Sequence, residues 1–170
     1  MNKFIQKNVD SGLLPEKVGE YIEEAIKNGE SIIVAGHRST GIRPLFAALS
    51  GAAKLESGSA VQVRGEDSFE KDGKYYLIPG NPKVDLGELV LKAVEKPDAA
   101  FVTVKDPEQP ISLQKILRQN KKNGGPTDKV FHEIALRKDG VGAGATPFTD
   151  KVTKFFYNEK GRVKREQLDF

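Results

Sequence analysis

The chain has 170 residues, enough for one ordinary domain that buries a core without disulfides or metals. It has no cysteine, which excludes disulfides, thiolate metal sites and cysteine nucleophiles. Its 27 basic and 24 acidic residues give a formal net charge of +3, a weak signal for a polyanionic partner. No apolar run approaches the roughly 20 residues of a membrane span, and the amino-terminal segment lacks the apolar core of a signal peptide. We therefore expect a cytoplasmic protein without membrane insertion.

The first third of the chain predicts the opening unit of an α/β fold. Apolar residues at 13–30 recur at helical spacing, and Asn28 with Gly29 provides a stop signal. The continuous apolar run at 31–35 is typical of a parallel strand that is buried on both faces. A loop bounded by glycines and a second helix, over about residues 43–53, follow.

The middle of the chain predicts a strand, a hairpin and a helix. Residues 59–65 form a strand pattern, and residues 68–82 predict a hairpin that turns at Asp72-Gly73, because side chains alternate on its second arm. Asp85 has the chemistry of an N-cap for a helix that covers 86–96.

The remaining elements complete the predicted core and add a terminal extension. A buried strand at 99–104 ends at charged and proline residues, where an α/β sheet places its ligand crevice. A helix at 112–122 follows, and then the pattern changes to strands around a glycine-rich loop at 141–147. We expect an α/β core over 1–126 and a β-rich extension of the same domain over 127–170.

A glycine-bounded loop carries the main chemical signal. Gly36 and Gly41 have the spacing of the phosphate-binding loop G-x-x-x-x-G-K-[ST], whose lysine neutralises phosphate charge and whose hydroxyl binds magnesium. Ile42 and Arg43 occupy those two positions here. Isoleucine carries no charge, and arginine repels the metal ion. The sequence therefore predicts no ordinary Mg-ATP hydrolysis, and we assign no catalytic residue, cofactor or metal.

Residual binding of ATP, ADP or phosphate stays open, since cations and hydroxyls surround a helix N-terminus. The candidate residues are Gly36, Arg38, Ser39, Thr40, Gly41 and Arg43. In this alternative Arg43 replaces the lysine, and the candidate metal ligands are Glu66, Asp67 and Asp106. The competing interpretation is that Arg38 and Arg43 are solvated or paired with nearby acids. A zinc site from the two histidines, His37 and His132, is disfavoured because they are far apart in sequence.

The arrangement of these motifs resembles a known family. The run "GLLPEKVGEYIEEAIKNGESIIVAGHRSTGIRPLFAAL" is similar to the entry into the RecA-like motor domain of the type II/type IV secretion, pilus and conjugation ATPases. "VQVRGEDSFE", with Glu66 and Asp67, resembles the family's acidic Asp box. "VDLGELVLKAVEKPDAAFVTVKDPEQPISLQKIL" resembles the stretch that carries the Walker B strand, with Thr103 at the glutamate position. The family's histidine box has no counterpart.

The resemblance implies a RecA-like P-loop core with a mainly parallel sheet flanked by helices. Because the lysine, the magnesium hydroxyl, the glutamate and the histidine box are missing together, it also implies a non-catalytic relative, a pseudo-ATPase that acts as a binding or regulatory module. The implied partner is a protein: a secretion or pilus motor subunit, or a second copy of this chain.

Nucleic-acid binding is a further, disfavoured alternative. The basic residues concentrate in 117–125 and 158–166, and either segment has the charge to contact phosphates. Phe155, Phe156 and Tyr157 lie near the second segment, as a stacking surface requires. Their alternation is more simply that of a hairpin with one face packed inward.

Overall fold

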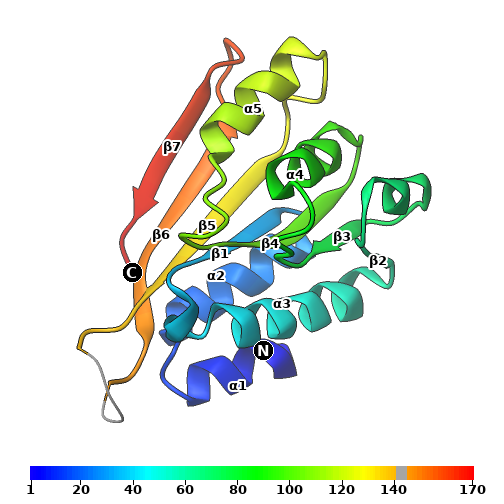
Figure 1. The fold of residues 1–170 in the computed structure, drawn as a ribbon. Helices are drawn as coiled ribbons and strands as arrows, with labels where there is room; N and C mark the ends of the chain where they lie inside the picture. The colour runs from blue at the N-terminus through cyan, green and yellow to red at the C-terminus, as the bar shows by residue number, and fades with distance from the viewer. Residues whose placement is uncertain (141–144) are drawn as a thin grey trace.

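The computed structural model describes residues 1–140 and 145–170, so part of the glycine-rich loop expected at 141–147 lies outside the described residues. The fold is α/β, built on one seven-stranded sheet with the order β2-β3-β4-β1-β5-β6-β7 (Figure 1). The strands are β1 (Ser31–Ala35), β2 (Ala60–Gln62), β3 (Tyr75–Ile78), β4 (Ala100–Lys105), β5 (Val130–Arg137), β6 (Phe148–Tyr157) and β7 (Val163–Leu168). The helices are α1 (Lys3–Asp10), α2 (Glu16–Lys27), α3 (Ile42–Ser57), α4 (Leu86–Glu95) and α5 (Leu113–Lys122), with the short 3-10 helices η1 (Arg38–Thr40) and η2 (Glu66–Glu70).

The sheet is mostly parallel, as the sequence predicts. Strands β1 to β5 run parallel, while β6 and β7 are joined to them by antiparallel pairing. The first strand of the 127–170 segment, β5, pairs in parallel with β1 and so belongs to the central part of the sheet. One continuous sheet therefore runs through both segments of the chain.

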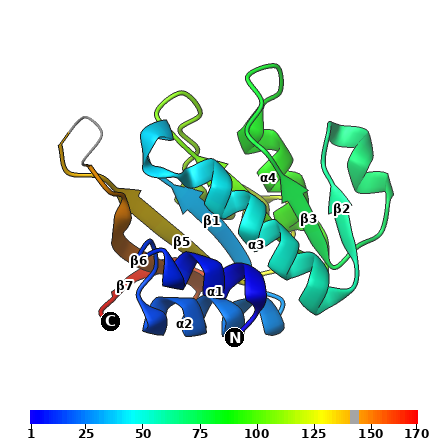
Figure 2. The same ribbon diagram turned by 90° about the horizontal axis from the view of Figure 1, so that it is seen from below.

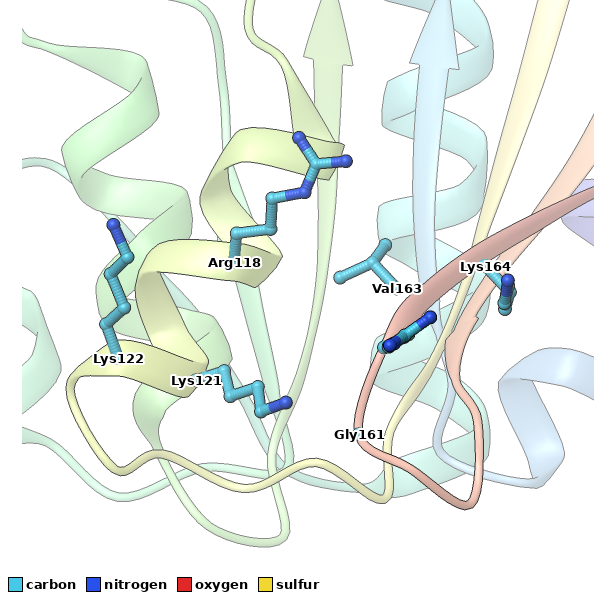
Figure 3. A pocket seen from close by; sticks show the side chains of 7 residues that line it. Arg118, Lys121, Lys122, Gly161, Val163 and Lys164 are labelled. Atoms are coloured by element: carbon cyan, nitrogen blue, oxygen red, sulfur yellow. The ribbon is translucent and has the colours of Figure 1, made fainter.

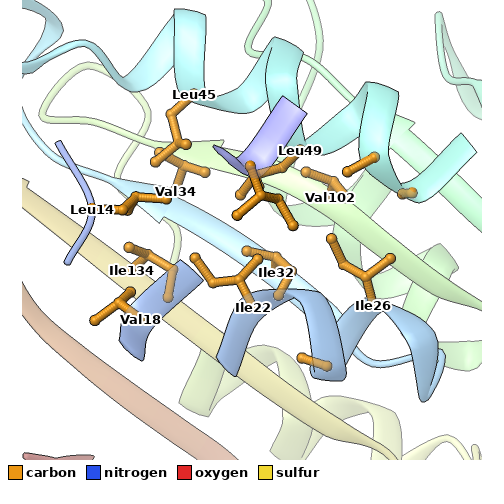
Figure 4. Close-up of a cluster of buried hydrophobic side chains, with 14 of the residues drawn as sticks. Leu14, Val18, Ile22, Ile26, Ile32, Val34, Leu45, Leu49, Val102 and Ile134 are labelled. Atoms are coloured by element: carbon orange, nitrogen blue, oxygen red, sulfur yellow. The ribbon is translucent and has the colours of Figure 1, made fainter. Parts of the chain in front are cut away.

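Helices cover both faces of the parallel strands (Figure 2). On one face α1, α2 and α3 pack against Ile32 and Val34, and on the other α4 and α5 pack against Ile33. Figure 4 shows the first of these two cores, where side chains of α2 and α3 meet those of β1. Each of the five residues of β1 is buried, which explains its uninterrupted apolar sequence. No helix of the described ranges is long and apolar enough to span a membrane.

The prediction of a hairpin that turns at Asp72-Gly73 is wrong. β3 pairs in parallel with both β2 and β4, and a loop with η2 connects it to β2. The alternation that suggests a hairpin arises because Tyr75 faces one core and Tyr76 the other, so every residue of β3 is buried. Gly73 is required by a close approach, since a Cβ atom there would lie 2.8 Å from a methyl carbon of Val61.

The helix α1 is absent from the predicted elements. Asn2 caps it by accepting a hydrogen bond from the Phe4 amide at 2.9 Å. Ile5 is its one fully buried residue, and it joins the core beneath α2 and α3. Elsewhere the expected end signals are confirmed: Asn28 is the C-cap of α2, and Asp85 caps α4 through the Glu88 amide.

A buried polar contact fastens α2 to β5. The His132 side chain is 3% exposed, and its Nε2 lies 2.7 Å from Oε1 of Glu30 while its Nδ1 lies 2.5 Å from the Tyr21 hydroxyl. A neutral imidazole satisfies both partners, because Nε2 donates to the carboxylate and Nδ1 accepts from the hydroxyl. Burial lowers the pKa of His132; Glu30 opposes this shift, and Lys154 on the neighbouring strand adds to it.

We predict that this contact makes stability sensitive to mild acid. The pKa of His132 is lowered on folding, so the unfolded chain takes up the proton first as the pH falls. Stability should therefore drop as the pH falls through the ordinary histidine pKa of about 6.5. Melting temperatures of the wild type should fall more steeply between neutral and mildly acidic pH than those of His132→Gln. If the melting temperature of the variant falls as steeply or more steeply, the prediction is wrong, and Glu30 keeps His132 protonated in the folded state.

Candidate functional site

The sheet topology places a switch point between β1 and β4. These strands are neighbours, but the chain leaves β1 toward α3 on one face and leaves β4 toward α5 on the other. In open α/β sheets ligands bind in the crevice at such a switch point, outside the carboxyl ends of the strands. The loop 36–41 follows β1 and the loop 106–112 follows β4, so the glycine-bounded motif lies at the switch-point crevice.

Both glycines of the motif are required by the backbone. Gly36 has φ +150° and Gly41 has φ +84°, conformations that other residues rarely adopt. A Cβ atom at Gly36 would also lie 2.7 Å from Oγ1 of Thr40 and 2.9 Å from the carbonyl oxygen of Leu136 on β5. The glycine spacing is thus explained by loop geometry and packing, independently of any phosphate.

Two amides of the loop, those of Ser39 and Thr40, are directed toward the loop itself. The His37 carbonyl accepts from the Thr40 amide at 2.9 Å and from the Thr40 hydroxyl at 2.5 Å. The Ser39 amide donates to Nδ1 of His37 at 3.2 Å. In a working phosphate-binding loop, such amides point at the phosphates. The amides of Ser39 and Thr40 could therefore bind an anion only after their hydrogen bonds to His37 had broken.

The position of the lysine in a phosphate-binding loop has a structural role here. Ile42 is fully buried and packs in the core between α3 and the sheet. Two residues later Pro44, in the first turn of α3, has no N–H group, so the helix N-terminus offers one donor fewer than usual. The start of α3 is built for packing against the sheet.

An ion pair crosses the crevice. Nη2 of Arg38 lies 2.5 Å from Oε2 of Glu108, which links the loop after β1 to the loop after β4. Both side chains are about half exposed or more, so the pair adds little to stability. Arg43 is exposed at the start of α3. The two candidate arginines therefore differ: Arg38 has an acidic partner, and Arg43 is solvated.

Two further positions near the crevice also have structural roles. Asp106 is buried, and its Oδ1 accepts from the amides of Glu108 and Gln109 at 2.8 Å each, which fixes the loop after β4. Thr103, the expected Walker B glutamate position, is fully buried within β4, and its hydroxyl donates to the Ile78 carbonyl at 2.8 Å. Thr103 thus lies inside the strand, away from solvent.

The Asp-box-like residues lie apart from the loop. Glu66 and Asp67 are exposed on η2, which follows the edge strand β2. Three strand spacings, about 14 Å, separate β2 from β1. Asp67 lines a separate surface cavity together with Arg64 and Lys71. The structure therefore does not bring these acids to the glycine-bounded loop.

The histidines are also separated. His37 belongs to the loop after β1, whereas His132 is buried against α2 and bonded to Glu30. Among the described residues, no group of three or more histidines and carboxylates is placed to hold a metal ion.

Comparison with known proteins adds no assignment. No protein-family model matches the sequence, and a search of curated proteins returns no match. The candidate site is therefore interpreted from its own geometry.

Sequence reasoning missed the residues that close the crevice. It treats Glu108 only as part of the Walker B resemblance, and it gives no role to the His37 ring nitrogen. Glu108 pairs with Arg38 across 70 positions of the chain, a relation that no local pattern carries. The His37 contact has a local signal, because a side chain that accepts from the amide two residues on is a common cap at the start of a short helix.

We predict that Gly36→Ala destabilises the protein more than Gly41→Ala. Both substitutions force a positive φ, which costs about 1–2 kcal/mol. Only a Cβ at position 36 also overlaps other atoms, which adds about 1–3 kcal/mol, whereas the space around Gly41 is open. Urea unfolding midpoints of the two variants test this difference. Equal losses would mean that Thr40 and the Leu136 carbonyl move aside without cost.

Proposed function

We propose that the protein is a non-catalytic, RecA-like module, a pseudo-ATPase related to the secretion, pilus and conjugation motors, that acts by binding a protein partner. The observation that carries the non-catalytic part is the burial of Ile42. The position that gives a P-loop its charged lysine contributes here to the hydrophobic core, so the loop has no point charge for the β- and γ-phosphates.

Three contacts support the same conclusion. The loop amides of Ser39 and Thr40 bond to His37, and Arg38 bonds to Glu108 across the crevice. An entering triphosphate would have to displace these contacts before it gained new ones. The order of the parallel strands, with the glycine-bounded loop after a central strand, is compatible with a motor-type core.

The binding role follows from what the core retains. A folded α/β domain with a closed crevice keeps the outer surfaces of a motor subunit while it loses turnover. We propose a motor subunit or a second copy of this chain as the partner, and a cytoplasmic location. Sedimentation velocity over a range of protein concentrations tests self-association, and a monomer at every concentration would remove that branch of the proposal.

We predict no magnesium-dependent ATP turnover. Phosphate release by the purified protein with excess Mg-ATP should equal that of Arg43→Ala, since the lysine position is the buried Ile42 in both proteins. The variant is a matched control because Arg43 is exposed, so its removal should leave the fold intact. Turnover by the wild type that disappears in Arg43→Ala would refute the non-catalytic assignment.

A second candidate function, anion binding by a rewired loop, is favoured by the exposure of Arg43 at the start of α3. In this alternative Glu108 competes with the anion for Arg38. Glu108→Gln should then strengthen ADP binding in calorimetry, and Arg43→Ala should abolish it. No change in either variant would leave the crevice without a role in nucleotide binding.

A further inference from the structure

The two basic segments of the sequence, 40 residues apart, meet in the structure. A cavity of about 650 Å³ lies between α5 and the turn that joins β6 to β7. Five cationic residues contribute to its walls: Arg118, Lys121 and Lys122 from the helix, and Arg162 and Lys164 from the hairpin. Val163 pairs with Tyr157 on the face of the sheet that α5 covers, so the side chain of the next residue, Lys164, points to the opposite face. Figure 3 shows Arg118 and Lys121 extending from α5 toward β7, and Val163 extending from β7 toward α5.

The positive charge of this cavity is not compensated by ion pairs. In the part of the chain that the structure describes, none of the five cations forms a salt bridge, and the cavity lining contains no acid. Lys121 and Lys122 lie in the last turn of α5, where they offset the partial negative charge of the helix end. The three other cations lie outside this helix turn, so a net positive potential remains.

Buried hydrogen bonds join the two walls of the cavity, which are α5 and the β6–β7 hairpin. The Tyr157 hydroxyl of β6 donates to the Leu117 carbonyl of α5 at 2.5 Å. The same hydroxyl accepts from the Asn120 amide group at 3.0 Å, which also donates to the Pro126 carbonyl. Tyr157 and Asn120 are both buried, so these bonds are shielded from water. The separation of helix and hairpin is thus set before any ligand arrives.

The turn that carries Arg162 is also fixed. Oδ1 of Asn158 accepts from the amides of Lys160 and Arg162 at 3.0 and 2.9 Å. Gly161 has φ +73°, and a Cβ atom there would lie 2.9 Å from Nζ of Lys121. The glycine therefore allows the turn and leaves room for the lysine beside it.

The cavity lies at the opposite end of the sheet from the glycine-bounded loop. The end of β6 pairs with the start of β5, through Val130 and Phe156, so the turn sits at the amino-terminal ends of the parallel strands. The loop at Gly36 follows the carboxyl end of β1. A ligand in the cavity would be independent of the degenerate phosphate loop.

The chemistry of the lining defines a ligand class. Lysine and arginine without a neighbouring acid select anions, and arginine selects phosphate through paired N–H donors. The cavity has the volume of a small-molecule site. Single-stranded nucleic acid needs exposed aromatic rings for stacking, and here Phe155 and Tyr157 are buried on the face of β6 that α5 covers. Phe156 is partly exposed, but it lies on the opposite face, away from the cavity. We propose that this cavity binds a compact anion that carries two or more phosphate groups.

Titration calorimetry with inorganic tripolyphosphate tests the proposal. The wild type should bind one equivalent, and orthophosphate should bind more weakly because it engages fewer cations. The double variant Arg118→Gln/Arg162→Gln should lose affinity by about tenfold or more, since each arginine supplies charge-assisted hydrogen bonds. Arg118→Gln/Lys121→Gln should do the same and serves as a second variant if the first misfolds, because both side chains extend from α5 toward β7. Lys7→Gln/Lys17→Gln removes the same charge from exposed positions on α1 and α2, and should retain full affinity.

Three results would overturn the proposal: no saturable binding of tripolyphosphate, an equal loss in the Lys7/Lys17 control, or tighter binding of a single-stranded oligothymidylate that both cavity variants abolish. The last result would identify a nucleic-acid surface instead. Heat from ATP that survives Arg43→Ala but disappears in Arg118→Gln/Arg162→Gln would assign the triphosphate to this cavity. The proposed pseudo-ATPase function is judged separately, by turnover at the loop.

Discussion

The rest of the structure depends on the burial of β1 on both faces. Ile32 and Val34 face the core beneath α2 and α3, while Ile33 faces the core beneath α4 and α5. A parallel strand of this kind needs helical crossovers on both sides of the sheet. These crossovers leave the sheet in opposite directions from β1 and β4, and this divergence creates the crevice at their carboxyl ends. The site thus follows from the way in which the core is covered.

The glycine-bounded loop shows how a binding shape persists without the groups that bind. Positive φ angles and a close approach to β5 require its glycines, and burial in the core fixes Ile42. None of these requirements involves a ligand. Some polar groups of the loop are satisfied internally: the Ser39 and Thr40 amides by His37, and the Arg38 side chain by Glu108. These bonds stabilise the loop and at the same time occupy donors that a phosphate would use.

The basic cavity presents the opposite arrangement. The Tyr157 hydroxyl and the Asn120 amide nitrogen are hydrogen-bonded, while the cations of the cavity lack ion-pair partners among the described residues. This arrangement favours binding. Because the walls of the cavity are already fixed, the protein loses little conformational entropy when a ligand binds. The molecule therefore has a phosphate-loop shape without the lysine at one end of the sheet, and a cluster of cations without ion-pair partners among the described residues at the other.

The sequence by itself determined the local elements: the buried strand at 31–35, the caps at Asn28 and Asp85, and the absence of the P-loop lysine. These features are local, because periodicity, caps and glycines act over a few residues. Only the tertiary structure decided that Tyr75–Ile78 is a central parallel strand, that Arg38 pairs with Glu108, and that two distant basic segments share a cavity. Such pairings join residues that are far apart in the chain, and they arise from the order in which strands are laid side by side, which no short pattern records.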